Sequence, residues 1–263
     1  PELEGRGRVD LALSVTPLRT AAHQVQGVTL VLDDLTEKRS LEATRRLFER
    51  MVSPRVIEHL DPESLHLGGR LEEITTLFAD LQGFTALGET VDPATLVSVV
   101  NRYLAAAAEA ILEQEGTIDK FLGDAIMAWF NAPIPQPDHR LRAARAALGL
   151  SRAAEALRRE MPEAFRLRFR VGVHTGAAIL GLIGTEYRVE YTAIGDSVNT
   201  AKRLQENAAS GTTLLSRQAI EPILDQVEAV QVESVQAQGK RSALEVWDLR
   251  GLRPGAQLQP DRS

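Results

Sequence analysis

Short apolar runs alternate along the chain with longer amphipathic stretches, and this alternation most restricts the folds that are possible. The run at 74–80 and the hairpin-like run at 117–130 are short enough to be strands, whereas the stretch after Asp138 has helical periodicity to about Glu160. Because hairpins are mixed with alternating strands and helices, we expect an α/β sandwich whose sheet contains antiparallel strands. With 44% hydrophobic residues, the 263-residue chain can fill its core.

The positions of the other elements follow from the same patterns. A helix is expected after the first run, ending near Glu115, and Asp138 is placed to be the N-cap of a second helix with its arginines on a solvated face. The segments LRFRVGVHTG and AAILGLIG are interpreted as two strands, and a further helix is expected over about 197–207.

Composition excludes several classes of function. The net charge of −6 argues against a general binder of nucleic-acid backbones. With no Cys, the chain has no disulfide, thiolate metal site or cysteine nucleophile, which fits a reducing compartment. No uninterrupted apolar run of membrane-spanning length or signal peptide is recognised, so we expect a soluble, cytoplasmic protein. Because the chain begins at Pro1, we also expect it to be a piece of a longer one.

The segment 1–36 contains two strand-like runs joined by a polar turn, followed by Asp34-Leu35-Thr36 where a helix would begin. This pattern resembles the last two strands of a PAS sensor domain and its exit motif, which implies an upstream sensor whose ligand pocket is not in this chain. An ordinary hairpin is the alternative interpretation.

The segment 37–61 is charged and is predicted to be a helical linker that breaks at Pro54. Two heptads of an a/d stripe fit either a coiled-coil stalk or a helix docked on its own domain. The stripe consists of Leu41, Thr44, Phe48 and Met51.

Two carboxylates stand where apolar strands turn. Asp80 ends the run LFAD and is followed by Gly83 and Thr85, and Asp124 follows Gly123 at the tip of a predicted hairpin. Taken alone, Asp80 could simply cap the next helix. A carboxylate pair without His or Cys suits Mg²⁺ held together with nucleotide phosphates.

Four segments in this order resemble the catalytic domain of class III nucleotidyl cyclases. The resemblance covers about 62–250, implies a ferredoxin-like fold with a mixed, largely antiparallel sheet, and leaves 251–263 as a disordered tail. The segments are FADLQGFT, DKFLGDAIMAWF, FRVGVHTG and YTAIGDSVNTAKR.

The resemblance implies a metal site made by Asp80, Asp124 and the Leu81 carbonyl. They would hold two Mg²⁺ or Mn²⁺ ions, which activate the ribose 3′-hydroxyl for in-line attack on the α-phosphorus and clamp the triphosphate as pyrophosphate leaves. The loop Gly83-Phe84-Thr85 would wrap the phosphates.

Lys120 and Thr192 match the residues that read the base in this family. A Lys donor suits adenine N1 and a Thr oxygen suits the adenine amino group, whereas guanylyl cyclases typically have Glu and Cys there. The resemblance therefore implies an adenylyl cyclase. The Thr variant also resembles a subgroup that includes bicarbonate-responsive enzymes, which makes bicarbonate a candidate activator.

Asn199 and Arg203 lie four apart on one predicted helical face and match the pair that stabilises the transition state. Arg170 and Lys240 match further cations that contact phosphates. No role is evident for His174, which we expect to be a core or strand histidine.

In this family the metal aspartates and the base-reading residues of one site come from different subunits. This chain carries both sets, so the resemblance implies a head-to-tail homodimer with two shared sites. A guanylyl cyclase and a catalytically silent nucleotide-binding module remain the alternative functions.

Overall fold

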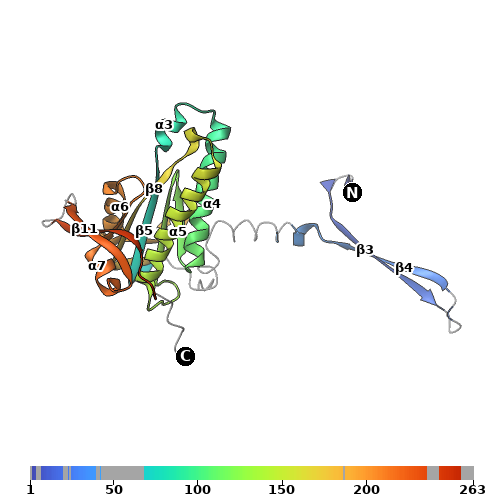
Figure 1. The fold of residues 1–263 in the computed structure, drawn as a ribbon. Coiled ribbons are helices and arrows are strands. Elements are labelled where there is room, and N and C mark those ends of the chain that lie inside the picture. The colour runs from blue at the N-terminus through green and yellow to red at the C-terminus, as the bar shows by residue number, and fades with distance from the viewer. Residues whose placement is uncertain are drawn as a thin grey trace. The chain divides into compact units, whose positions relative to one another are not determined.

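The computed structural model describes residues 2–3, 7–19, 23, 25–39, 42, 68–185, 187–235 and 243–255 (Figure 1). The chain divides into two compact units, Pro1–Pro54 and Arg55–Ser263. Most of the predicted linker over 37–61, the tail beyond Gly255 and Lys240 lie outside the described residues.

The first unit contains the hairpin expected from the sequence. Strands β3 (Leu11–Arg19) and β4 (Val25–Asp34) pair antiparallel, and β1 (Glu2–Leu3) pairs with β2 (Gly7–Arg8). One face of the hairpin is apolar and open, because the opposed pair Leu13 and Leu32 is 59% and 64% exposed.

The predicted helix start after the hairpin is confirmed. Residues 36–39 are helical, and the Asp34 carboxylate accepts a hydrogen bond from the backbone N–H of Thr36 at 3.0 Å. The Thr36 hydroxyl in turn accepts from the backbone N–H of Asp10 at 2.9 Å, which ties the helix start to the hairpin.

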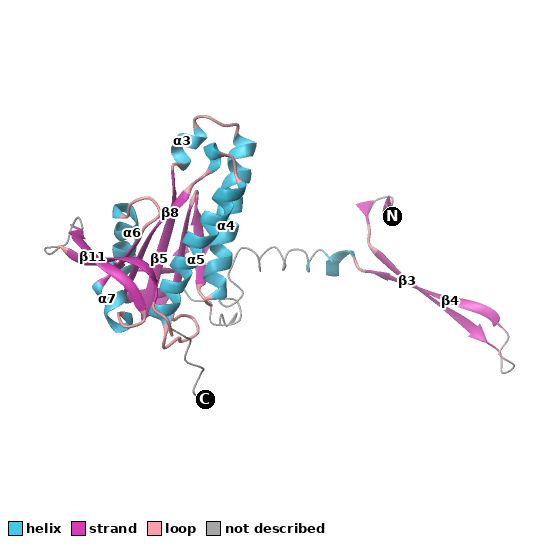
Figure 2. Ribbon diagram, viewed as in Figure 1, coloured by secondary structure: helices cyan, strands magenta, loops and turns pink. Residues whose placement is uncertain are grey.

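The second unit is built from one large sheet and the helices that cover it (Figure 2). Its strands are β5 (Gly68–Gln82), β6 (Thr117–Leu122), β7 (Ala125–Phe130), β8 (Arg168–Thr185), β9 (Arg188–Ile194), β10 (Thr213–Ser216), β11 (Val227–Val235) and β12 (Leu244–Leu252). Its helices are α3 (Phe84–Gly88), α4 (Pro93–Glu113), α5 (His139–Glu160), α6 (Asp196–Asn207) and α7 (Arg217–Ile220), with 3₁₀ turns at Glu163–Phe165 and Glu221–Ile223.

The sheet has the order β11-β12-β10-β8-β5-β7-β6, and β9 pairs with the second half of β8. Among the described strands, neighbours are antiparallel except β8 and β10. The expected sandwich with a mixed, largely antiparallel sheet is therefore confirmed. The last strand reaches Leu252, so it continues past the boundary predicted at residue 250.

Alternation along β5 gives the sheet two packed faces. Leu77, Ala79 and Leu81 join the core formed with α4 and α5, whereas Ile74 and Phe78 pack with α6 on the opposite face. The figures show α4 and α5 over one side of the sheet and α6 on the other (Figures 1 and 2). Side chains at even-numbered positions near the end of β5 therefore belong to the α6 side.

The single helix expected to end near Glu115 is wrong, because the structure has two. Helix α4 begins anew at Pro93, where Asp92 accepts a hydrogen bond from the Thr95 N–H and Pro occupies the first turn. By length and composition α4 is apolar enough to cross a membrane, but Val99, Tyr103 and Ile111 on it are buried in the core.

The two strands expected over LRFRVGVHTG and AAILGLIG form one continuous strand, β8. Its glycines provide close packing rather than a turn. A Cβ added at Gly172 would lie 2.2 Å from the Gln205 nitrogen and 2.3 Å from the Ala201 oxygen, both on α6. The glycine therefore lets the helix approach the strand.

Helix α5 begins after Asp138 as predicted, but the Asp138 side chain does not cap it. Its carboxylate instead accepts from Arg142 Nε at 2.6 Å, and Arg142 also pairs with Glu115 at 2.5 Å. Arg145 is only 8% exposed. The expectation that the arginines form a solvated face is therefore wrong for these two, because Arg142 bridges Asp138 and Glu115 and Arg145 is buried.

Candidate active site

Asp80 lies near the end of β5 on the face that α6 covers. It follows Phe78 by two residues on the same side of the strand, and its side chain is 13% exposed. The carboxylate that the sequence places after an apolar run therefore lies at the edge of the core.

Asp124 is brought beside Asp80 by the β6–β7 turn. Gly123 has φ +69°, a left-handed conformation that glycine adopts without strain, and Asp80 stands opposite Ala125 in the β5–β7 pairing. The Leu81 N–H donates to the Asp124 carbonyl at 3.3 Å. Burial raises the pKa of Asp124, and the Asp80 charge raises it further, so the two carboxylates interact electrostatically.

Arg170 neutralises this acidic pair. It stands opposite Asp80 in the β5–β8 pairing, and its Nε and Nη2 donate to Asp80 Oδ2 at 2.7 and 2.6 Å. Lys202 on α6 is a second cation nearby, since both it and Arg170 lower the pKa of Asp124.

The donor set fits a hard divalent cation held jointly with a ligand. Within the described ranges, no three or more His, Cys, Asp and Glu side chains are grouped to hold a metal. The neighbouring carboxylates Asp80 and Asp124 and the Leu81 carbonyl are hard oxygen donors. Mg²⁺ typically takes one or two carboxylates and completes its shell with phosphate oxygens and water.

Lys120 and Thr192 approach each other through a residue that the sequence analysis did not select, Asp119. The Thr192 hydroxyl donates to Asp119 Oδ2 at 2.9 Å, and Lys120 Nζ lies 3.8 Å from the same oxygen. Lys120 also forms an ion pair with Glu190 of β9. Lys120 and Thr192, which are 72 positions apart in the sequence, therefore lie next to the same carboxylate oxygen of Asp119.

Asp119 occupies a β-bulge in β6. The pairing with β7 shifts between Ile118 and Lys120, which leaves Asp119 as the extra residue. Its side chain is 1% exposed, and burial raises its pKa to about 6 despite the opposing effects of Lys120 and the Thr192 hydrogen bond. A bulge has no clear sequence signature, so the sequence indicated Asp119 only by placing an acidic residue inside an apolar strand.

Asn199 and Arg203 are on α6, one turn apart, as predicted. The helix starts after Gly195, whose φ is +152°, and the Asn199 N–H donates to the Gly195 carbonyl at 3.2 Å. Asn199 is exposed and Arg203 is partly exposed, so both side chains are accessible to a ligand.

The predicted phosphate loop lies where the chain turns at Gly83, between β5 and α3. Gly83 has φ +91° and is the N-cap of α3, while Phe84 packs partly against the core and Thr85 is exposed. His174 is buried in β8, and its Nδ1 lies 2.7 Å from the Ser216 hydroxyl, as expected for a core histidine.

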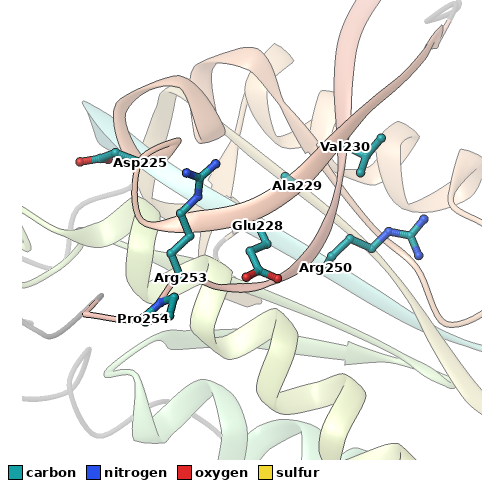
Figure 3. Close-up of a pocket in the computed structure, with 7 residues that line it drawn as sticks. All are labelled: Asp225, Glu228, Ala229, Val230, Arg250, Arg253 and Pro254. Atoms are coloured by element: carbon teal, nitrogen blue, oxygen red, sulfur yellow. The ribbon is translucent and has the colours of Figure 1, made fainter.

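An open hollow of about 710 Å³ lies elsewhere, at the β11–β12 edge (Figure 3). In the sheet order this edge is opposite to β6 and β7. Arg250, which lines the hollow, pairs with Asp248 at 2.5 Å, and Arg253 donates to the Val227 carbonyl. Among the residues that the structure describes, none of those predicted for the site lines it.

The fold and the carboxylate pair define a class of enzyme, and comparison with known families agrees. Residues 68–251 match the adenylate and guanylate cyclase catalytic domain, so the chain belongs to the class III nucleotidyl cyclases. Members of this family use nucleotide substrates, generally depend on divalent metals and typically dimerise.

Individual relatives include enzymes of both base specificities. Adenylate cyclase 1 of Rhizobium meliloti is 35% identical over 200 residues, which make up 72% of this chain and 30% of that relative. The guanylyl cyclase Cya2 is similar with a TM-score of 0.68 and 31% identity, covering 72% of this chain and 97% of that one. The adenylyl cyclase CyaB from P. aeruginosa has a TM-score of 0.68 and 27% identity, with coverage of 72% and 98%.

Proposed function

We propose that this chain is an adenylyl cyclase that converts ATP to 3′,5′-cyclic AMP and pyrophosphate. The observation that carries the proposal is the convergence of Lys120 and Thr192 on Asp119. The Lys120 ammonium is a hydrogen-bond donor, and the Thr192 hydroxyl, which already donates its proton to Asp119, can accept. This donor and acceptor match N1 and the amino group of adenine.

The acidic end of β5 supports a role for divalent metal. Asp80, Asp124 and the Leu81 carbonyl would hold Mg²⁺ or Mn²⁺, and two such ions would supply activation of the 3′-hydroxyl and neutralisation of phosphate charge. Arg170 would then move from Asp80 toward the phosphates, because a metal replaces it as the counter-charge of that carboxylate.

The remaining side chains would bind the triphosphate and the ribose. Backbone N–H groups after Gly83 and the Thr85 hydroxyl suit phosphate oxygens. Asn199 would orient the ribose, and Arg203 would offset the charge that grows on the phosphates in the transition state. Lys240 stays a proposed phosphate contact on the resemblance alone.

We further propose a homodimer with shared sites. Exposed apolar side chains flank the base-reading pair, since Phe121 is 50% exposed next to Lys120 and Ile194 is 46% exposed near Thr192. Apolar groups in these positions suit burial against a second copy of the chain.

Product analysis tests the function directly. The protein would be incubated with Mg²⁺ or Mn²⁺ and either ATP or GTP, and the nucleotides separated by chromatography. Cyclic AMP and pyrophosphate should form in equal amounts from ATP. A dimeric preparation that binds ATP but forms no cyclic AMP would contradict the proposal and favour a silent nucleotide-binding module.

A guanylyl cyclase is the second candidate, favoured by the 31% identity to Cya2. Cya2 is named as a guanylyl cyclase, and the similarity to it covers 72% of this chain. The same chromatography separates the two, because a guanylyl cyclase would form cyclic GMP faster than cyclic AMP at equal substrate concentration.

We also propose an upstream sensor, a cytoplasmic location and bicarbonate activation. The proposal of an upstream sensor is supported by the open apolar face of the β3–β4 hairpin, which suits the end of a larger PAS-like sheet. The proposal of bicarbonate activation is supported by Thr192 alone. Cyclase rates with and without bicarbonate at fixed pH test the last point, and an unchanged rate would remove it.

A further inference from the structure

The Asp119 side chain is buried at the base-reading pair, and the function proposed above uses it only as the point where Lys120 and Thr192 meet. Its carboxylate is within hydrogen-bonding distance of the Thr192 hydroxyl and close to the Lys120 ammonium, and the β-bulge at this position explains why it can reach both. Asp119 is five residues before Asp124, and its neighbours Lys120, Thr192 and Glu190 differ from those of Asp124, which are Asp80, Arg170 and Lys202.

The hydrogen bond determines which way the Thr192 hydroxyl points. A hydroxyl has one proton to donate and two lone pairs that accept, whereas an ionised carboxylate only accepts. Thr192 must therefore donate to Asp119, and its oxygen can only accept from a ligand. With 1% exposure of the Asp119 side chain and 8% exposure of Thr192, water cannot easily replace this arrangement.

The same carboxylate keeps Lys120 next to the hydroxyl. Lys120 Nζ is 3.8 Å from Asp119 Oδ2, and Glu190 pairs with it on the more exposed side. A base would thus meet a donor from Lys120 and an acceptor from Thr192. Adenine presents the complementary N1 acceptor and amino donor, while guanine presents an N1–H donor and a 6-oxo acceptor.

We infer that Asp119 is a positioning residue that sets the base specificity by holding Thr192 as a hydrogen-bond acceptor. This inference rests on the proposed function. The inference goes beyond the proposed function because it assigns the preference for adenine to a residue that need not touch the nucleotide. Without the carboxylate, the hydroxyl could turn its proton toward the 6-oxo group of guanine.

The first test compares kcat/KM for ATP and GTP in wild type and Asp119→Asn. The amide keeps the size of the side chain but can donate as well as accept, so the ratio for ATP over GTP should fall about tenfold or more. The loss should arise mainly in kcat/KM for ATP, with that for GTP unchanged or raised. Asp248→Asn is the matched control, since Asp248 is another buried carboxylate, on β12.

A double mutant separates positioning from a structural role. Thr192→Val removes the hydroxyl, so adding Asp119→Asn to it should leave the ATP/GTP ratio unchanged. If Asp119 only supports the fold, Asp119→Asn should lower activity on both substrates equally and do so in both backgrounds. Equal loss of activity on both substrates, or a further change of the ratio in the Thr192→Val background, would overturn the inference.

A wild-type measurement covers the case in which Asp119→Asn does not fold. The ATP/GTP ratio should decrease as the pH is lowered from 8 to 5.5, because protonated Asp119 can donate to Thr192. Lys120 and Glu190 are the charged groups that face Asp119, and protonation of the metal carboxylates affects both substrates alike. A flat ratio would contradict the inference, while absence of any cyclic nucleotide would contradict the proposed function itself.

Discussion

At the scale of single residues, the charge balance at the end of β5 depends on Asp80. Arg170 compensates its charge in this structure, and the pKa of Asp124 is raised partly because Asp80 is close. A neutral amide at position 80 would remove a hard oxygen anion while keeping the shape of the side chain. This separates the chemical role of the carboxylate from its packing.

We expect Asp80→Asn to lower kcat by about a hundredfold or more, because a metal-binding anion is lost from the reacting centre. Steady-state rates with ATP and Mg²⁺ measure this. Asp92→Asn is the matched control, since Asn caps helices as well as Asp does and α4 should be unaffected. Equal activity of Asp80→Asn and wild type would contradict the metal role.

Asp119 also makes the stability of the fold depend on pH. Its pKa is about 6 when folded, against an ordinary value of 3.8, so the folded state holds the proton more tightly than the unfolded state. Stability should therefore fall as the pH rises from about 4 to 6 and level off above that range. The raised pKa corresponds to at most about 3 kcal/mol.

Denaturant unfolding of wild type and Asp119→Asn at several pH values tests this expectation. The free energy of unfolding of wild type, minus that of the variant, should decrease between pH 4 and 6 and then remain constant. Subtraction removes the contributions of other titrating groups. A difference that rises with pH would show that Asp119 has a lowered pKa instead.

At the scale of elements, the contact between β8 and α6 positions half of the proposed site. Gly172 brings the strand within backbone contact of α6, the helix that carries Asn199 and Arg203. Any side chain at this position must push the helix away from the sheet. Stability and catalysis should therefore be lost together.

Gly172→Ala should destabilise the protein by about 2 kcal/mol or more, because its Cβ would overlap two backbone atoms of α6. It should also lower cyclase activity in the fraction that remains folded. The matched control is Gly88→Ala, where the nearest atom to the added Cβ is Leu96 Cδ2 at 3.4 Å. Thermal unfolding of both variants decides the point, and equal stability would refute the packing argument.

At the scale of the whole molecule, the proposed homodimer predicts complementation between inactive variants. Asp80→Ala damages the metal side of a site and Asn199→Ala damages the side contributed by the other subunit. In a mixed dimer both defects would fall in one site, which leaves the second site intact.

Equal mixing and random exchange should restore about a quarter of wild-type activity, because half of the dimers are mixed and each has one of two sites. Cyclic AMP formation after mixing measures this, and each variant alone is the control. No recovery, with subunit exchange demonstrated independently, would exclude sites shared in this way.

The local sequence was sufficient for much of this protein. Apolar runs that end in a turn predicted the strand that carries Asp80, although it extends over Gly68–Gln82 rather than 74–80, and the hairpin around Gly123. Strand periodicity and turn chemistry act over a few residues, which makes such elements predictable. The motifs also identified the family, which the match over residues 68–251 confirms. Element boundaries were less reliable, as the division between α3 and α4 shows.

The tertiary structure alone decided which side chains meet. Strand β8 runs without interruption from Arg168 to Thr185 and is approached closely by α6 at Gly172, and the contact between Asp119 and Thr192 joins residues 73 positions apart at a bulge. Neither follows from local preference, because long-range packing determines where a strand can continue and which way a bulged side chain points. The sequence thus determined the chemical groups of the site, and the folded chain determined how their protons and charges are arranged.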